Sequence, residues 1–406
     1  MRTFITSVDI EHCSDAPIAS TIETLFRGSA RAANVLLFMA FSATAAPVIT
    51  QTSSVFDHHA TVTIAGTGFG PKVTAAPIVW DDASGATMSN NWDGAWPDCG
   101  NPAYAMRYYA PMRGISLPHS HVSKYIAGAH GENGYLTSCG ATGGPVVIFW
   151  KNRTISLPAY TYAAWYQRFD NAWVFNPTIN NPPNDNNLKV YDYSVGGSPM
   201  DNNNRYVSYG LGPTDNSQIV QWTVNDDGAS MSNPDINGHN YWWGPSVNPM
   251  AGQWSKIELA VKITNQNDGY IMIWENGALK VNYVGPTDKY PGTARNDGIG
   301  GYARAYGSGN NWRYFADVYL DYTLARVVLA NSPNLGSATI VEPQIPSTWT
   351  GSAISITVNL GKFSAGQTAY LFVVDSTGVP SAAGFPVAVG GTATQTIQPP
   401  PNLRVQ

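Results

Sequence analysis

Residues 64–70 read Ile-Ala-Gly-Thr-Gly-Phe-Gly, and they follow directly on a β-prone run, Ala-Thr-Val-Thr-Ile, at 60–64. Gly66, Gly68 and Gly70 predict a sharp corner, because glycine takes left-handed and tightly turned conformations without a steric penalty at Cβ. The stretch therefore predicts a strand that ends in a tight corner, early in a small β domain.

This corner resembles the early strands of an IPT/TIG immunoglobulin-like domain, which carry the pattern I-x-G-x-G-F-G. The late strands of such a domain are expected within tens of residues, but here the corresponding segments lie at 349–358 and 369–378. The resemblance implies one small sandwich, built from residues 47–76 and 335–390 and divided by a large insert. Function is expected to lie in the insert.

The composition indicates an extracellular all-β protein. Of the 406 residues, 12% are charged and 12% are aromatic, and the chain has 39 glycines and 28 prolines. Few charges with many turn formers and aromatic residues are typical of secreted β proteins. The net charge of −5 and the lack of a basic run argue against nucleic acid as a partner.

The N-terminal region predicts an export signal. Arg27 and Arg31 precede an apolar run at 32–41, and Ala-Thr-Ala at 43–45 offers a small-residue cleavage site. The run is too short to span a bilayer. We predict a signal peptide at 1–45 and a secreted protein, whether extracellular, periplasmic or at the cell surface. The alternative is a buried N-terminal helix.

Export changes the interpretation of the cysteines. Cys13 would be removed with the signal peptide, whereas Cys99 and Cys139 would remain. An even pair in an oxidising compartment predicts a disulfide bond between them.

The rest of the mature chain alternates as short strands do. In residues 254–263, apolar side chains occupy every second position and charged ones lie between them, which predicts a strand with one solvated face. Asn276-Gly277 separates two β-prone runs and predicts a hairpin, since both turn positions need a positive φ. Residues 314–321 and 325–330 predict two more strands.

The order of these late strands resembles a concanavalin A-like (LamG-like) jelly roll, as found in lectins, laminarinases and several polysaccharide lyases. It runs W-x-x-I-E, then D-G-x-x-x-x-W-x-x-G, then D-V-Y-L-D and A-R-V-V-L. The resemblance implies an all-β chain: a jelly roll at 77–334 inserted in the small discontinuous sandwich. A proline-rich tail follows at 391–406. In such folds the concave sheet carries the carbohydrate site.

Four strand-like segments carry polar and aromatic side chains that could line this sheet, at 160–169, 188–193, 204–209 and 218–222. Side by side they would form a trough for an anionic glycan, because arginine pairs with carboxylates in a bidentate manner. Ordinary cross-strand pairing of tyrosine with lysine or arginine is the alternative. The candidates are Tyr166, Tyr191 and His130 for proton transfer, Arg168, Lys189 and Gln221 for neutralising a carboxylate, and Tyr193, Arg205, Tyr206 and Trp222 for binding substrate.

Elimination suits this inventory better than hydrolysis. A glycosidase needs two carboxylates at a set separation, but the E-x-D-x-x-E motif of the laminarinase-like relatives is absent. The mature chain has glutamates only at positions 132, 258, 275 and 342. β-Elimination from a uronate instead needs a neutralised carboxylate, a base and an acid. The R-x-E-x-R and Q-I-H blocks of one alginate-lyase family are also absent. A non-catalytic glycan-binding or adhesion protein and a structural surface protein therefore remain alternatives.

Signals for metal ions are weak. His119 and His121 could share a face of a strand, but loop histidines without a ligand are the favoured interpretation, since zinc sites show clearer ligand spacing. Loops rich in Asn and Asp, at 184–187, 201–204 and 265–268, could hold a structural calcium ion or simply form turns. Residues 298–301, Gly-Ile-Gly-Gly, are interpreted as a turn.

Overall fold

The computed structural model describes residues 45–85, 92–96, 107–109, 115–130, 146–171, 188–195, 205–211, 220–226, 241–243, 252–287, 294–302 and 311–390. The predicted signal peptide (apart from residue 45), both cysteines of the predicted disulfide and the proline-rich tail lie outside these ranges. The regular secondary structure of the described ranges is all β-strand, apart from one short 3-10 turn at Leu335–Ser337.

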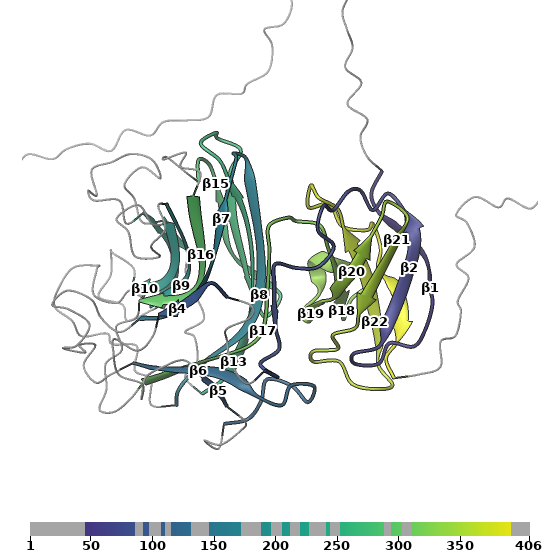
Figure 1. Ribbon diagram of the computed structural model, residues 1–406, viewed down its shortest axis with the longest axis horizontal. Helices are drawn as coiled ribbons and strands as arrows, with labels where there is room; N and C mark the ends of the chain where they lie inside the picture. Colours follow the sequence, from purple (N-terminus) through teal and green to yellow (C-terminus); the bar gives the residue numbers. More distant parts are fainter. Residues whose placement is uncertain are drawn as a thin grey trace, which may run out of the picture. The chain divides into compact units, whose positions relative to one another are not determined.

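The larger part is a jelly-roll β-sandwich of two antiparallel sheets (Figure 1). Sheet D has seven strands, in the order β12 (Tyr241–Trp243), β11 (Val220–Asp226), β10 (Arg205–Leu211), β9 (Leu188–Val195), β16 (Ala294–Tyr302), β7 (Val146–Thr154) and β4 (Gly94–Trp96). Sheet C has eight: β15 (Ala278–Val284), β14 (Tyr270–Glu275), β13 (Trp254–Ile263), β8 (Ala159–Phe169), β17 (Asn311–Asp321), β6 (Tyr125–His130) and β5 (Arg107–Tyr109), with β3 (Val79–Asp81) paired to β17.

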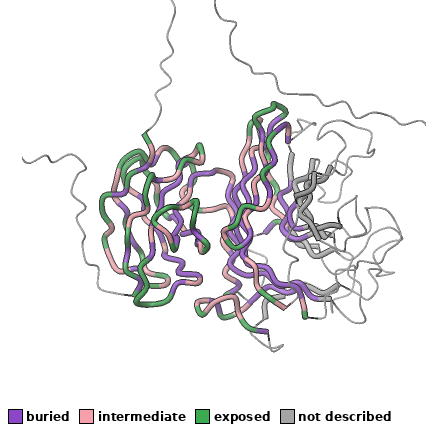
Figure 2. The backbone as a smooth tube through the Cα atoms, turned by 180° about the vertical axis from the view of Figure 1, so that it is seen from behind, coloured by how far each residue is buried: buried purple, intermediate pink, exposed green. Residues whose placement is uncertain are grey.

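Apolar side chains from both sheets fill the space between them. Strand β13 shows why: Ile257, Leu259, Val261 and Ile263 alternate along it and all join one buried core cluster. Phe149 of β7 and Ile299 of β16 enter the same cluster from sheet D. Buried residues accordingly run along the central strands (Figure 2). The predicted strand at 254–263 is confirmed, residue for residue.

The predicted hairpin is also confirmed. Strands β14 and β15 pair antiparallel, and the two turn residues, Asn276 and Gly277, have φ angles of 50° and 76°. These are the left-handed values that a two-residue hairpin turn requires.

Replacing Gly277 with alanine should therefore destabilise the protein by about 1–3 kcal/mol. Its φ is left-handed, and an added Cβ would lie 2.7 Å from the Cα of Thr339 and press on the carbonyl oxygen of Ala338. Urea denaturation would measure the loss. The matched control is Gly351→Ala, because nothing lies within 4 Å of a Cβ there. Equal stability losses in the two variants would contradict this account of the turn.

The second part is a smaller sandwich of two four-stranded sheets. One sheet has the order β1 (Val48–Thr52), β2 (Thr61–Thr67), β21 (Ala353–Thr357) and β20 (Ile345–Trp349); the other has β19 (Val341–Pro343), β18 (Arg326–Ala330), β22 (Thr368–Val374) and β23 (Phe385–Ala388). Strand β2 pairs directly with β21, which places Val62 opposite Ile356 and Ile64 opposite Ile354. The small sandwich is therefore discontinuous in sequence.

The glycine corner closes this small sandwich. Gly68 and Gly70 have φ angles of 73° and 68°, and Phe69 between them is fully buried in the core. The indole of Trp349 donates a hydrogen bond of 3.1 Å to the carbonyl of Gly70. The corner thus holds the early and late segments together. Membership of the IPT/TIG family stays a prediction.

Strand β18 corrects the expected division of the chain. The sequence pattern assigned residues 325–330 to the jelly roll, but β18 pairs with β19 and β22 of the small sandwich. Val327 and Leu329 enter the core of that sandwich. The sequence pattern correctly predicted a strand at 325–330 but assigned it to the wrong sheet. Alternation of apolar residues indicates a strand, but it does not specify which strand will pair with it.

The outer face of sheet C is a second correction. Lys256 and Glu258 alternate with the core residues of β13 and were expected in solvent, yet they are 4% and 7% exposed. Residues of the small sandwich cover them, as the contacts of the next section show. The solvated face that the period-two pattern predicts is therefore covered at Lys256 and Glu258, whereas Lys262 further along stays partly exposed.

Candidate functional site

The predicted site residues fall on two different sheets. Strands β9, β10 and β11 are neighbours in sheet D, as expected, and pair Tyr193 with Arg205 and Arg205 with Asp226. Strand β8, however, lies in sheet C between β13 and β17. The expectation that all four segments form a single surface is therefore wrong.

Tyr166 and Arg168 point away from the core of the jelly roll, as their alternation with Trp165 and Phe169 predicted. That face of sheet C is covered, however. The Tyr166 side chain is fully buried, and its hydroxyl donates a hydrogen bond to Glu342 of β19. Burial, and then the Glu342 charge, raise the pKa of the Tyr166 hydroxyl well above its usual value. Tyr166 is held as a structural hydrogen-bond donor at this position.

Arg168 is buried as well, at 7% exposure. Its guanidinium donates to the Ser116 hydroxyl (3.3 Å) and to the side-chain oxygen of Asn171 (3.0 Å). Two polar partners of this kind fix the guanidinium on the covered face of sheet C, away from the strands of sheet D.

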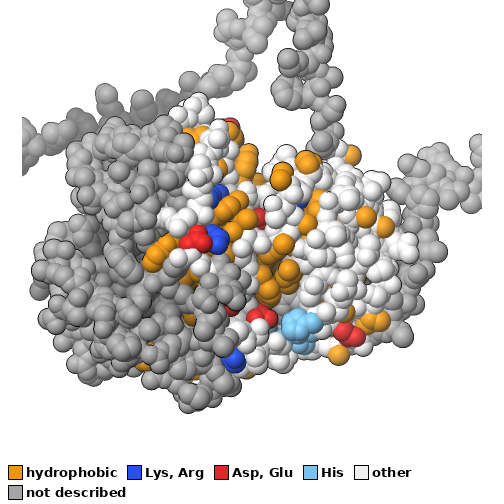
Figure 3. Space-filling model, viewed as in Figure 1, with side chains coloured by type: hydrophobic (Ala, Val, Ile, Leu, Met, Phe, Trp, Pro, Cys, Tyr) orange, Lys and Arg blue, Asp and Glu red, His pale blue; other side chains and the backbone are white. Residues whose placement is uncertain are grey.

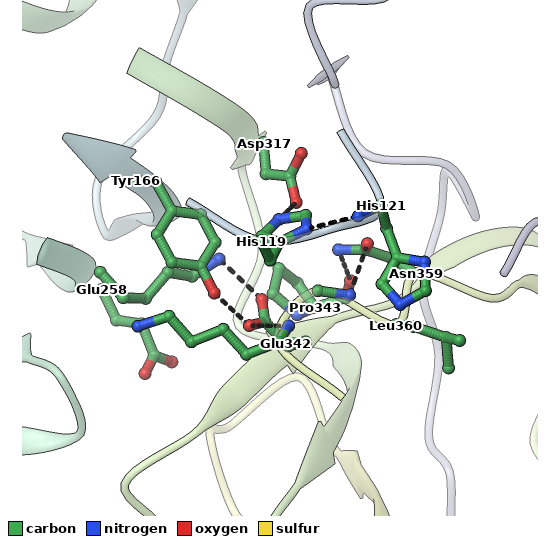
Figure 4. Close-up of polar contacts among 12 residues, drawn as sticks. His119, His121, Tyr166, Glu258, Asp317, Glu342, Pro343, Asn359 and Leu360 are labelled. Atoms are coloured by element: carbon green, nitrogen blue, oxygen red, sulfur yellow. Dashed lines mark hydrogen bonds and ion pairs between the residues drawn. The ribbon is translucent and has the colours of Figure 1, made fainter. Parts of the chain in front are cut away.

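Glu342 is the centre of a buried polar network between the two sandwiches (Figure 4). Besides Tyr166, it meets the ammonium group of Lys256 at 3.0 Å and accepts the backbone N–H of Lys362 at 3.2 Å. His119 contacts Asp317 nearby, at 2.8 Å, and its ring lies 5.2 Å from that of Tyr166. The network neutralises buried charges and joins β8 and β13 to β19.

Tyr191 lies in the core of the jelly roll instead of on its surface. Its side chain is fully buried, and its hydroxyl donates to Asp297 of β16. Thr161 also donates to Asp297 (3.0 Å), and Arg153 Nε lies 2.8 Å from the other carboxylate oxygen. Burial raises the pKa of the Tyr191 hydroxyl well above its usual value. The expected exposed position of Tyr191 is therefore wrong.

The other candidates are described at the level of the backbone. His130 is the last residue of β6 in sheet C, where it pairs with Asn311. The remaining six lie on strands of sheet D, and the structure does not describe their side chains. They are Lys189 and Tyr193 on β9, Arg205 and Tyr206 on β10, and Gln221 and Trp222 on β11. Their roles stay predictions.

On the outer face of sheet D, the structure describes two side chains close to these strands, Trp150 and Asn296, which we call the platform. Phe149 and Ile299 face the core, so alternation turns Trp150 of β7 and Asn296 and Gly298 of β16 outward. Gly298 stands directly between Trp150 and Asp192 of β9 in the register. The glycine, which is itself buried, has no side chain beside the half-buried indole of Trp150.

Asn296 adds an unusual polar group to this face. The residue is 1% exposed, yet neither the nitrogen nor the oxygen of its side-chain amide has a hydrogen-bond partner among the described residues. A buried amide without partners is costly, and such groups often mark functional positions. The exposed Asn152 is its direct neighbour on β7. An indole and an amide thus lie on neighbouring strands.

The sequence patterns missed both residues. Gly298–Gly301 was interpreted as a turn, but these residues lie within β16, so that interpretation is wrong. The glycines belong to a strand because β7 pairs with all of them, and β9 pairs with Gly298 on the other side. The alternation Asn296, Gly298, Gly300 is visible in the sequence, and a strand assignment would have placed all three on one face.

His58, His59 and His121 cluster, and histidine side chains form a patch on the face that Figure 3 shows. The rings of His58 and His59 are 3.8 Å apart, and those of His58 and His121 are 4.7 Å apart. His119 and His121 lie in a turn rather than a strand, and His121 Nε2 is 2.9 Å from the carbonyl oxygen of Phe363. Burial, together with the neighbouring His59 and His121, lowers the pKa of His58 to about 4.

The free energy of unfolding should therefore decrease as the pH is lowered below 6.5. A folded-state pKa below the ordinary 6.5 means that folding favours neutral His58, so this contribution is complete above pH 6.5 and is lost between pH 6.5 and about 4. We expect His58→Asn, which keeps an acceptor for the N–H of Leu360, to flatten that loss. Urea denaturation across this pH range measures the effect. Identical pH profiles for the two proteins would rule it out.

The search for ion sites covers the described residues alone. Among them, no group of three or more His, Cys, Asp or Glu side chains is placed to hold a metal ion. Of the three loops considered for calcium, 265–268 is described, and there Asp268 forms an ion pair with Lys262 at 2.5 Å. Within the same residues, the structure contains no helix with the length and hydropathy of a membrane span.

The chain was compared with family models, curated sequences and solved structures, and only solved structures match it. No family model and no curated sequence matches the chain. Among solved structures, an endo-β-1,4-glucuronan lyase from the fungus Trichoderma reesei matches with a TM-score of 0.42 and 14% identity, over 61% of this chain and 97% of that one. An alginate lyase, vAL-1, from Chlorella virus matches with a TM-score of 0.36 and 12% identity, over 61% and 99%. Domain 4 of AbnA, an extracellular arabinanase from Geobacillus stearothermophilus, matches with a TM-score of 0.31 and 13% identity, over 61% and 95%. With TM-scores below 0.5 and identities below 15%, these similarities do not indicate the chemistry of this chain.

Proposed function

We propose that the protein is secreted and binds an acidic extracellular polysaccharide on the outer face of sheet D. The observation that carries the proposal is the half-buried indole of Trp150, opposite Gly298, beside the Asn296 amide, which has no hydrogen-bond partner among the described residues. An aromatic ring suits the C–H face of a sugar, and an amide can both donate to and accept from hydroxyl or carboxylate groups.

The neighbouring strands favour an anionic ligand. Lys189 lies on β9, the strand next to β16, and pairs with Ser208 of β10, two residues along from Tyr206, which pairs with Asp192 beside Gly298. A cation suits the carboxylates of a uronate chain on a protein whose net charge is −5. Tyr206 of β10 and Gln221 of β11 complete the proposed binding residues. Arg205 and Tyr193 align with the buried Asp297, and Trp222 alternates with Gln221, so these three are not part of the proposed surface.

Cleavage by β-elimination is a second activity of the same proposal. Tyr166 and Tyr191 are each bonded to a buried carboxylate, and Tyr193 aligns with the buried Asp297. Proton transfer at sheet D would therefore fall to Tyr206, which pairs with Asp192 beside Gly298. His130, the other predicted base, belongs to sheet C. A non-catalytic adhesion protein would use the same platform without turnover.

Affinity electrophoresis and absorbance test the two activities separately. Gels containing glucuronan, alginate, pectate or a neutral glucan should show retardation of the wild-type protein by at least one acidic polymer. Growth of ultraviolet absorbance from unsaturated uronate ends would add the lyase activity. Retardation by none of the acidic polymers would refute the binding proposal.

Variants locate the binding. Asn296→Ala and Lys189→Ala should each weaken retention in the retarding polymer by about tenfold, as expected for residues that carry much of the binding energy. Tyr206→Phe should abolish elimination while retaining binding. Unchanged retention in both Asn296→Ala and Lys189→Ala would move the site away from sheet D.

A further inference from the structure

A cavity of about 400 Å³ lies on the opposite side of the jelly roll from sheet D. It opens over the outer face of β13 and β14, and its other wall comes from the small sandwich, from Arg326 of β18, Val341 of β19 and Val374 of β22. The volume is within the range of about 300–1,000 Å³ that is usual for small-molecule sites, and such sites are common where two β units meet.

One wall is a row of three large side chains on β14. Tyr270, Met272 and Trp274 occupy alternate positions and are half-buried, whereas Ile271 and Ile273 between them are buried in the core. All three line the cavity. The row therefore presents two aromatic rings and a thioether on one face, on a rigid strand paired on both sides.

Two charged groups of opposite sign reach the same cavity, and both are held in place. Glu258 accepts a hydrogen bond of 2.8 Å from the Tyr162 hydroxyl. The Arg326 guanidinium stacks 4.0 Å from the centre of the Tyr162 ring and donates to the carbonyl of Leu324 at 2.8 Å. Arg326 Nε is buried and has no hydrogen-bond partner within the described part of the chain. A carboxylate accepts several hydrogen bonds, so Glu258 also retains capacity for a ligand.

We propose that this cavity binds one or two units of a neutral sugar. The carboxylate and the guanidinium cancel in net charge, which disfavours a charged ligand and suits one with several hydroxyl groups. Trp274 and Tyr270 offer aromatic faces to the apolar face of a sugar ring. Ala260 and Gly336, which also line the cavity, leave room for it. The site is on sheet C and is independent of the acidic-glycan site proposed on sheet D.

Isothermal titration calorimetry of the full chain tests the proposal with D-glucose, D-galactose, N-acetyl-D-glucosamine, cellobiose and sodium D-glucuronate. We expect saturable binding of at least one neutral sugar and weaker binding of glucuronate than of glucose. Trp274→Ala should weaken the neutral sugar at least tenfold. Ala260→Leu should do the same by filling the cavity with a side chain that is compatible with a buried position.

A matched control is Trp80→Ala, which truncates another half-buried indole of sheet C that does not line the cavity. It should bind the neutral sugar as the wild type does, and thermal melting would verify that all three variants fold. The proposal is overturned if none of the neutral sugars binds saturably, if glucuronate binds more tightly than glucose, or if folded Trp274→Ala and Ala260→Leu retain wild-type affinity.

Discussion

Replacing Glu342 with alanine should lower the free energy of unfolding by about 3–5 kcal/mol. The change leaves the ammonium group of Lys256 buried without its counter-charge, and it removes the acceptor of the Tyr166 hydroxyl and of the Lys362 N–H. Breaking a buried ion pair by deleting one member typically costs this much, because the remaining charge is uncompensated. Urea denaturation of the wild type and the variant would measure it.

The control for Glu342→Ala is an exposed ion pair that also involves a lysine of β13. Lys262 of β13 forms an ion pair with Asp268, whose side chain is 67% exposed. Asp268→Ala should therefore change stability by about 0–1 kcal/mol, as exposed ion pairs do. If Glu342→Ala were as mild as Asp268→Ala, the buried network would not be what holds the two sandwiches together.

Replacing Asp297 with alanine should cause a loss of similar size, about 3–5 kcal/mol, by the same mechanism. Asp297 is fully buried, faces Arg153 Nε at 2.8 Å, and accepts hydrogen bonds from Thr161 and Tyr191. These contacts tie β16 and β9 of sheet D to β8 of sheet C. The variant should therefore weaken the packing of the two sheets, and its unfolding transition in urea should move to a lower concentration.

Asp93 provides the comparison for Asp297. It forms an ion pair with Lys151 of β7 at 2.7 Å, and both side chains keep a quarter to a third of their exposure. Asp93→Ala should cost about 0–1 kcal/mol. A loss in Asp297→Ala that is no greater than in Asp93→Ala would show that the charge of Arg153 finds another partner, contrary to the contacts described.

Local features of the fold were predictable because they depend on neighbouring residues. The alternation in β13 and the Asn276-Gly277 turn each need only a few adjacent positions, and both are as expected. The pairing of β2 with β21, almost 300 residues later, could be expected only from a family resemblance. The assignment of β18 failed because no local pattern specifies which sheet a strand joins.

The candidate site was less predictable for the same reason. Tyr166 and Arg168 have the alternation of a polar strand face, but that face is covered by partners such as Glu342, which is 176 residues from Tyr166. Tyr191 is instead buried between the two sheets, where it meets Asp297. Tyrosines that the sequence pattern suggested would be exposed are therefore buried and donate hydrogen bonds inside the protein. Trp150 and Asn296 escaped notice because their importance depends on Gly298, which only the strand register places between β7 and β9.

The most direct test of the central claim compares two tryptophan variants in affinity gels that contain the retarding acidic polysaccharide. Trp150 is on the outer face of sheet D, and Trp80 is a half-buried indole on sheet C. The account predicts that Trp150→Ala loses most of the retardation while Trp80→Ala migrates as the wild type does. Full retardation of Trp150→Ala, with its fold verified by thermal melting, would contradict the account.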